Sequence, residues 1–136
     1  MKKLFFYFFF YFAILSLISG CMGVAKVAKY GYINKEGNMV INPQFDDTYS
    51  FFRTYSFREG LATAKVGEKW GYINKEGTMI IRPEFYDICD FKEGLAGVQV
   101  GGKWGYINKE GNMVIKPQFD SAVPFSEGLA VVGLYQ

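Results

Sequence analysis

The stretch that decides the fold is Lys69-Trp70-Gly71-Tyr72-Ile73-Asn74-Lys75-Glu76-Gly77. The same sequence recurs at residues 103–111, and a third copy at residues 29–37 differs only in having Tyr30 in place of Trp. Each copy is followed by Met, two aliphatic residues, a variable residue, Pro, Gln or Glu, and Phe; after a spacer, Phe-x-Glu-Gly-Leu-Ala completes the unit. Self-similarity at this period indicates a repeat architecture of stacked supersecondary units.

Each unit is predicted to begin with a β-hairpin. In the second unit, an extended run at residues 61–66 is separated from the run at 69–73 by Gly67 and Glu68. Two residues, the first a Gly, between two extended runs favour a tight hairpin turn. Gly101-Gly102 stands in the same place in the third unit.

A second turn and a third strand are predicted to follow the hairpin. The side chain of Asn74 is expected to fold onto nearby backbone amides, and Gly77 can take the positive φ that the turn requires. The strand at residues 79–81 is expected to stop at Arg82-Pro83, because Pro has no amide to donate to a sheet. We therefore predict an all-β fold of three tandem repeats, each with about three antiparallel strands in a hairpin or meander array.

The Trp-Gly strand should bury its aromatic side chains between units. Strand alternation places Trp70 and Tyr72 on one face, with Gly71 and Ile73 on the other. Gly71 leaves room for a close approach, and we expect an aromatic ring of a neighbouring strand there. The terminal units lack strands that the middle unit has. Both edges of the array therefore stay open, or the terminal strands pair and close it.

The first unit carries a private insertion. Thr-Tyr-Ser-Phe occurs at residues 48–51 and again at 54–57, which lengthens this unit by six residues relative to the others. Surface loops tolerate insertions at small entropic cost, so residues 48–53 are predicted to form a surface loop. Its aromatic residues, Tyr49, Phe51, Phe52 and Tyr55, are candidates for a contact patch if exposed, and packing over the sheet is the alternative.

The first residues are predicted to be an export signal. A basic head, Met1-Lys2-Lys3, precedes a 14-residue apolar run from Leu4 to Leu17. This pattern is typical of a secretory signal and is shorter than the ~20 residues of a spanning helix, although an uncleaved anchor is the alternative. The domain boundaries that we predict are a helical signal peptide at 1–20, a segment at 21–28 that contains Cys21 and a tether, and a repeat domain at 29–136 with units at about 29–60, 61–94 and 95–136.

The segment Ile18-Ser19-Gly20-Cys21 resembles the lipobox of bacterial lipoproteins. The resemblance implies lipidation of Cys21, cleavage after Gly20 and lasting membrane attachment, which a single acyl chain alone would not give. Met22 in place of Asp implies the outer membrane, if the source has one. The alternative for Cys21 is a plain thiol or a disulfide with Cys89, which we otherwise expect to be a small, mostly buried residue.

Composition excludes several classes of function. Without Lys2 and Lys3, the 15 basic residues fall to 13 and balance the 13 acidic ones, so the exported chain has no electrostatic footprint for nucleic acid. The chain has no His, which removes the commonest general base and metal ligand. We predict no cofactor, no metal site and no catalytic residues.

The residues that could carry chemistry also have structural interpretations. Glu59, Glu93 and Glu127 recur one unit apart, so they do not converge on one substrate as glycosidase carboxylates do. Turn glutamates bonded to backbone explain them better. Aromatic rings in a repeated β-array can stack on sugars or cations, which makes Trp70, Trp104 and Tyr30 candidate binding residues. Packing between units is the favoured interpretation for the same rings.

The combined motif Lys-Trp-Gly-Tyr-Ile-Asn-x-x-Gly, Val-Ile-x-Pro-x-Phe and Phe-x-Glu-Gly-Leu-Ala-x-Val resembles the WG repeat family over residues 29–133. Tyr30 and the six-residue insertion are the departures from the pattern. The resemblance implies an all-β repeat scaffold, often in bacterial secreted or envelope proteins, with no common activity.

Together these features predict an exported, lipid-anchored protein of the bacterial cell envelope that acts as a non-catalytic binding or interaction scaffold. Its expected partners are the membrane, through acylated Cys21, and a protein or a cell-wall glycan. A glycan- or peptidoglycan-binding module that uses the repeat aromatics is the alternative, and an envelope hydrolase is the third and weakest hypothesis.

Overall fold

The computed structural model describes residues 28–46 and 56–136, and the regular secondary structure within these ranges is entirely β. The described strands are β1 (Lys29–Ile33), β2 (Met39–Asp46), β3 (Ala62–Val66), β4 (Lys69–Ile73), β5 (Met79–Phe85), β6 (Asp87–Ile88), β7 (Leu95–Val100), β8 (Lys103–Asn108), β9 (Met113–Phe119), β10 (Ser121–Ala122) and β11 (Val132–Gly133). The three predicted strand types recur as β1, β4 and β8, then β2, β5 and β9, then β3, β7 and β11. The all-β repeat fold is confirmed, whereas the two-residue strands β6 and β10 in the spacers were not predicted. The helix predicted for residues 1–20 lies outside the described residues.

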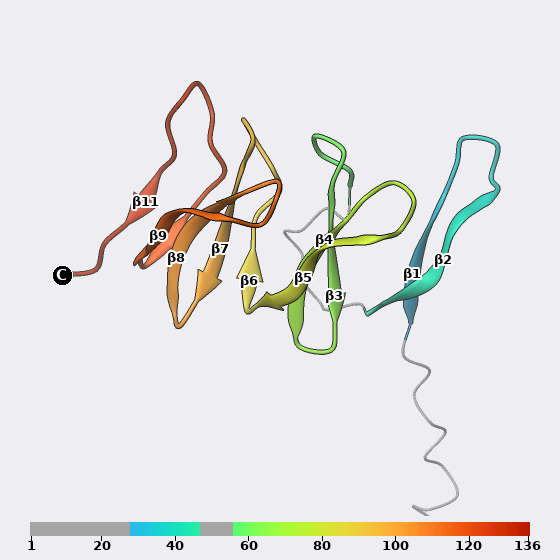
Figure 1. Cartoon of the computed structure of the whole chain (residues 1–136), viewed down its shortest axis with the longest axis horizontal. Coiled ribbons are helices and arrows are strands. Elements are labelled where there is room, and N and C mark those ends of the chain that lie inside the picture. Colours follow the sequence, from blue (N-terminus) through green and yellow to red (C-terminus); the bar gives the residue numbers. More distant parts are fainter. Residues whose placement is uncertain (1–27, 47–55) are drawn as a thin grey trace, which may run out of the picture.

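The strands form antiparallel sheets that follow one another along the chain. Their orders are β1-β2, β3-β4-β5, β6-β7-β8-β9 and β10-β11. β6 joins the sheet of the following unit, where Ile88 pairs with Val98, and β10 joins β11 in the same way. In Figure 1 the first hairpin, β1 and β2, and the last strand, β11, lie at opposite ends of the molecule. The described array is therefore open, which decides between the two arrangements that the sequence allowed.

The predicted turns are confirmed. Val66 pairs with Lys69 across the hairpin, and Gly67 has a φ of 61°. In the next turn Oδ1 of Asn74 accepts hydrogen bonds from the backbone N–H groups of Glu76 (3.2 Å) and Thr78 (2.8 Å). Gly77 then takes a φ of 80°.

The prediction that the third strand stops at proline is wrong, because β5 runs through Pro83 to Phe85. Tyr72 pairs with Ile81 and Trp70 with Phe85, so the segment of β5 between these pairs is two residues longer than that of β4. The extra residues bulge, and a proline in a bulge loses no ladder hydrogen bond.

The bulge explains the glycine of the Trp-Gly pair. A Cβ atom on Gly71 would overlap the carbonyl oxygen of Ile81 and lie 2.9 Å from the backbone nitrogen of Pro83. Gly31 and Gly105 face the same groups of β2 and β9. The predicted close approach to the glycine is confirmed. The group that approaches is the backbone of the neighbouring strand, whereas the sequence led us to expect an aromatic ring.

The hydrophobic core lies between successive units. Each interface buries the same five positions. One unit contributes an Ile and a Phe, and the hairpin that follows contributes an Ala, an Ala or Val, and an Ile. We call these five positions the interface quintet. Its members are Ile41, Phe45, Ala62, Ala64 and Ile73 at the first interface, and Ile81, Phe85, Ala96, Val98 and Ile107 at the second. No unit buries its apolar face alone, as expected of stacked repeats.

Candidate binding surface

Trp70 and Trp104 belong to the core, which corrects their candidacy as binding residues. Their side chains are only 4% and 8% exposed. Trp70 pairs with Phe85 on one side and with Lys65 on the other, and the Lys65 ammonium lies 5.7 Å from its ring centroid. A buried ring cannot stack on a sugar, so packing between units is the role that the geometry supports.

Tyr72 and Tyr106, which follow the two motif tryptophans by two residues, also have structural roles. The hydroxyl groups of Tyr72 and Tyr106 donate hydrogen bonds to the carbonyl oxygens of Cys89 (2.6 Å) and Val123 (2.9 Å). Tyr72 also packs edge-on against Phe91, with the ring centroids 4.7 Å apart. Burial, and then the proximity of Cys89, raise the pKa of Tyr106, so its hydroxyl remains a hydrogen-bond donor at neutral pH.

The other predicted binding residues are distributed differently. Tyr30 is 39% exposed at the start of the array, where its two counterparts are buried tryptophans. Tyr49, Phe51, Phe52 and Tyr55 lie outside the described residues, as does Cys21. Of the seven candidate aromatic residues, the structure therefore describes Trp70, Trp104 and Tyr30, and the two tryptophans are buried.

The three recurring glutamates form turns. Glu59, Glu93 and Glu127 have φ values of 52°, 53° and 52°, in the left-handed region, and each precedes a Gly that also has positive φ. In the first of these turns Arg58 and Leu61 exchange two backbone hydrogen bonds. This geometry is that of a two-residue hairpin turn with positive φ at both central positions.

Each glutamate side chain also connects its unit to the next. Oε2 of Glu59 accepts a hydrogen bond from the N–H of Gly94 (3.1 Å), and Oε2 of Glu93 accepts one from the N–H of Gly128 (3.0 Å). Lys109 adds an ion pair to Glu59 at 3.2 Å. Desolvation raises the pKa of the Glu59 carboxyl, but the bonds from Lys109 and the Gly94 and Glu93 amides outweigh it and lower the pKa. An ionised, bonded carboxylate of this kind is not a general acid.

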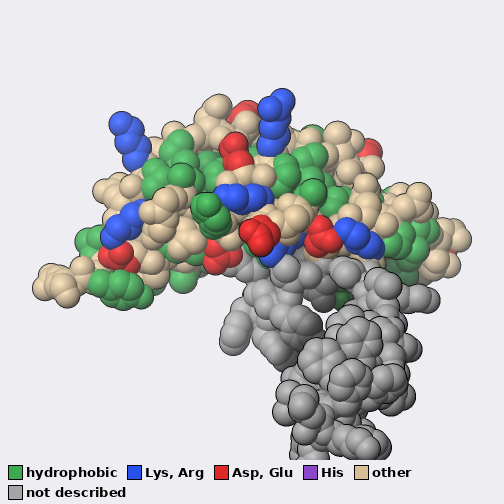
Figure 2. All heavy atoms as spheres, turned by 90° about the horizontal axis from the view of Figure 1, so that it is seen from below, with side chains coloured by type: hydrophobic (Ala, Val, Ile, Leu, Met, Phe, Trp, Pro, Cys, Tyr) green, Lys and Arg blue, Asp and Glu red, His purple; other side chains and the backbone are tan. Residues whose placement is uncertain are grey.

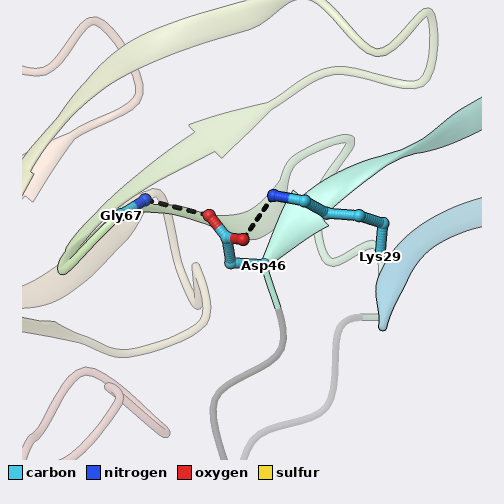
Figure 3. Close-up of polar contacts among 3 residues, drawn as sticks. All are labelled: Lys29, Asp46 and Gly67. Atoms are coloured by element: carbon cyan, nitrogen blue, oxygen red, sulfur yellow. Dashed lines mark hydrogen bonds and ion pairs between the residues drawn. The ribbon is translucent and has the colours of Figure 1, made fainter. Parts of the chain in front are cut away.

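Lysine and aspartate form a clamp in the first and last units. Lys29 donates to Oδ1 of Asp46, whose Oδ2 accepts the N–H of Gly67 at 3.0 Å (Figure 3). Lys103 and Asp120 repeat the pair, with the N–H of Tyr135 as the second donor at 2.9 Å. Both bonds lower the pKa of the two aspartates, and the bond from the lysine has the larger effect in each case.

The middle unit has a different clamp. Tyr86 occupies the position of Asp46 and Asp120, and the ammonium of Lys69 lies 3.0 Å from the centroid of its ring. A cation over an aromatic face replaces the ion pair here.

The described acidic residues and Cys89 form no cluster that could hold a metal ion. Cys89 is half-buried and is not in a disulfide. Across residues 28–46 and 56–136 we find no helix with the length and apolar character needed to cross a membrane.

The repeat also presents an outer row of aliphatic side chains, Val40, Ile80 and Val114, which sequence reasoning missed. They occupy equivalent positions in β2, β5 and β9 and are 55%, 46% and 55% exposed. The signal was available, because the second aliphatic residue of Met-Val/Ile-Ile belongs to the interface quintet and strand alternation turns the first outward. On the face that Figure 2 shows, apolar patches lie between charges of both signs.

Comparison with known proteins identifies the repeat. The sequence model of the WG containing repeat family matches residues 30–70, 70–104 and 104–134, which together span most of the chain. No curated protein and no solved structure matches. The matched segments follow the sequence repeat, each beginning at a Trp-Gly or Tyr-Gly strand, so the segment 70–104 joins β4 and β5 of one sheet to β6 and β7 of the next. The chain therefore belongs to the WG containing repeat family.

Proposed function

We propose that this protein is a non-catalytic binding scaffold, anchored in the bacterial cell envelope through acylated Cys21. The observation that carries the proposal is the use of its polar side chains. The carboxylates of Glu59, Glu93, Asp46 and Asp120 all bind groups of their own array. Side chains engaged in this way hold repeats together, which leaves the exposed surface for a partner.

The outer row is the surface that we propose for a protein partner. Val40, Ile80 and Val114 repeat at equivalent positions, with Asn42, Arg82 and Lys116 exposed two residues further along each strand. Aliphatic contacts flanked by polar side chains are typical of protein–protein interfaces. The burial of Trp70 and Trp104 removes the main support for the alternative, a glycan-binding array.

The anchor is tested by metabolic labelling. The full chain is expressed in bacteria with a labelled fatty acid, beside Cys21→Ser and the matched control Cys89→Ser. We expect label and membrane retention in the natural protein and the control, and neither in Cys21→Ser. Equal labelling of all three would contradict the proposed anchor.

The binding role is tested with a matched pair of triple variants. One variant replaces Val40, Ile80 and Val114 by Gln, and the control replaces Glu36, Glu76 and Glu110, which are exposed on turns away from the outer row, by Gln. Immobilised proteins are incubated with a detergent extract of bacterial envelopes, and retained proteins are quantified. We expect a discrete set retained by the natural protein and the control but lost by the first variant.

Two further outcomes would support the other hypotheses instead. Retention of purified peptidoglycan by the natural protein would favour the glycan-binding module. Hydrolysis of peptidoglycan that disappears in Glu59→Gln, with the fold intact, would overturn the non-catalytic proposal.

A further inference from the structure

The last unit presents apolar side chains that the earlier units bury. Leu129 is 77% exposed, whereas its counterpart Leu61 is 9% exposed. Val132 is 36% exposed, whereas its counterpart Val98 is fully buried. This end of the described array therefore presents an apolar face, whereas the repeats that cap an array typically have a polar one.

A third interface quintet is present in the chain but divided between the two ends of the array. Ile115, Phe119, Ala130 and Val132 occupy four of its positions in the last unit, and the first three are only half-buried. The fifth position, held by Ile73 and Ile107 at the other interfaces, belongs in the first unit to Ile33. Ile73 and Ile107 are 0% exposed, but Ile33 is 64% exposed. The first unit thus offers the residue that the last unit lacks.

The turns match in the same way. A Cβ atom on Gly77 would lie 2.9 Å from Cγ2 of Ile41, and one on Gly111 would lie 3.6 Å from Ile81. These turns therefore pack directly on the preceding unit. Around Gly37, the equivalent residue of the first unit, no described atom lies within 4 Å of the same position. Ile115 is the surface on which the Gly37 turn would pack.

The glutamate connections lead to the same pairing. Glu59 and Glu93 each bind the N–H of the turn glycine one unit further on. Glu127 has the same left-handed turn geometry. The corresponding turn glycine in the first unit is Gly60, which has the position of Gly94 and Gly128. Figure 1 places the first and last units at opposite ends, so one copy cannot bring these groups together.

We propose that the last unit of one copy binds the first unit of a second copy, head to tail. β1 of the second copy lies antiparallel along residues 129–134 of the first, in the register that β3 and β7 show with β4 and β8. Ala64 pairs with Gly71 and Val66 with Lys69. In the same register, Val132 faces Gly31 of the second copy and Leu134 faces its Lys29.

The contact is heterologous, so each copy keeps one free end of each kind and can add further copies. The inference goes beyond the proposed function and does not depend on acylation of Cys21. A second copy is the occupant that the observations favour, because three independent features of one end find their counterparts at the other.

The register is tested by disulfide cross-linking of the full chain in detergent. Leu134→Cys and Lys29→Cys are placed in separate copies that carry different tags, mixed, and oxidised. Both side chains are exposed, so neither change opens the core. Lys29→Cys removes the ion pair to Asp46, so circular dichroism is used to check that this variant is folded. The control mixes Lys29→Cys with Val114→Cys. A mixture of two differently tagged copies of the natural protein measures any cross-linking through Cys21 and Cys89. We expect two-tag dimers from the first mixture alone.

The strength of association is tested by measuring the average molecular mass in solution as a function of protein concentration. Ile33→Asn should abolish association. The control is Val100→Asn, at an exposed aliphatic position of β7 away from both ends, and it should leave association unchanged. Glu127→Gln should weaken association about tenfold, or about 1.4 kcal/mol, and Glu110→Gln should not. Circular dichroism confirms that each variant keeps its fold.

Three results would overturn the inference. A monomer at every concentration without two-tag dimers would exclude association. Equal cross-linking between two Leu134→Cys copies would indicate a symmetric edge-to-edge contact. In a single chain that carries both Lys29→Cys and Leu134→Cys, a disulfide between these two cysteines would indicate a closed array.

Discussion

The carboxylate of Glu59 accepts a hydrogen bond from the backbone N–H of Gly94, 35 residues later in the chain. Glu93 makes the same bond to Gly128 across the same separation. One repeat period thus separates a turn from the turn that it supports, and the polar connection runs parallel to the hydrophobic quintets. Both kinds of contact act between units, so the stability of one unit depends on its neighbour.

Loss of this connection should weaken the array moderately. In Glu59→Gln the charge-assisted bonds to Gly94 and Lys109 are lost, and we expect the free energy of unfolding to fall by about 0.5–1 kcal/mol, since the group is partly exposed. Urea unfolding measures the change. Glu110→Gln, on an exposed turn, is the matched control, and an equal loss in both variants would refute the role given to Glu59.

Gly71→Ala should destabilise the protein strongly. The added methyl group would overlap the carbonyl of Ile81, and backbone in a bulge cannot rotate away as a side chain can. We expect a loss of roughly 1–3 kcal/mol, typical of overpacking, in urea unfolding. Gly97→Ala is the control, because its Cβ would be 3.3 Å from the side-chain sulfur of Cys89. A tolerated Gly71→Ala would show that the bulge does not require the glycine.

Stability should fall in acid because of the aspartate clamps. Asp46 and Asp120 have pKa values below their ordinary 3.8, so the unfolded chain binds protons more tightly than the folded one. Their stabilisation is therefore fully present above pH 3.8 and is lost as the pH falls through the folded pKa. The melting temperatures of the natural protein and of the double variant Asp46→Asn/Asp120→Asn should therefore differ at neutral pH and become equal in acid. A constant difference between the two at every pH would contradict this linkage.

Tryptophan emission should report a buried environment. Trp70 and Trp104 share one repeat position and are both buried, so we expect blue-shifted fluorescence that acrylamide quenches poorly. Tyr135→Trp provides an exposed reference, since Tyr135 is 81% exposed. Its added emission should be red-shifted and readily quenched. Red-shifted emission from the natural protein would revive the stacking role of the two tryptophans.

The duplicated segment at residues 48–53 stays a prediction, since residues 47–55 lie outside the described part of the chain. Deleting residues 48–53 restores the spacer length of the other two units. If the segment is a surface loop, the melting temperature should be nearly unchanged. A large decrease would mean that the insertion packs on the array.

The local structure of each unit could be predicted from its residues, because turn chemistry acts over a few positions. Asn74 and Gly77 behave as their sequence indicated, and so does the hairpin at Gly67. The error at Pro83 has a definite cause. A bulge depends on the register between two strands, and a proline tolerated there looks the same in sequence as a proline that ends a strand.

The candidate surface was harder to predict because it depends on stacking. The repeated Trp is compatible with an exposed row and with a core, and only the packing of β4 between neighbouring units decides that Trp70 is buried. The contact of Glu59 with Gly94 likewise depends on how units stack. The outer row could have been found, since alternation places Val40 opposite in orientation to Ile41.

The exchange of aspartate for Tyr86 in the middle unit has a consequence for how the array opens. The ion pairs of Asp46 and Asp120 respond to acid, whereas the contact of Lys69 with the Tyr86 ring contains no carboxylate. Proteins open locally in cooperative segments whose free energies differ. On acidification the two terminal units should therefore loosen before the middle unit does, so the molecule opens from its ends inward.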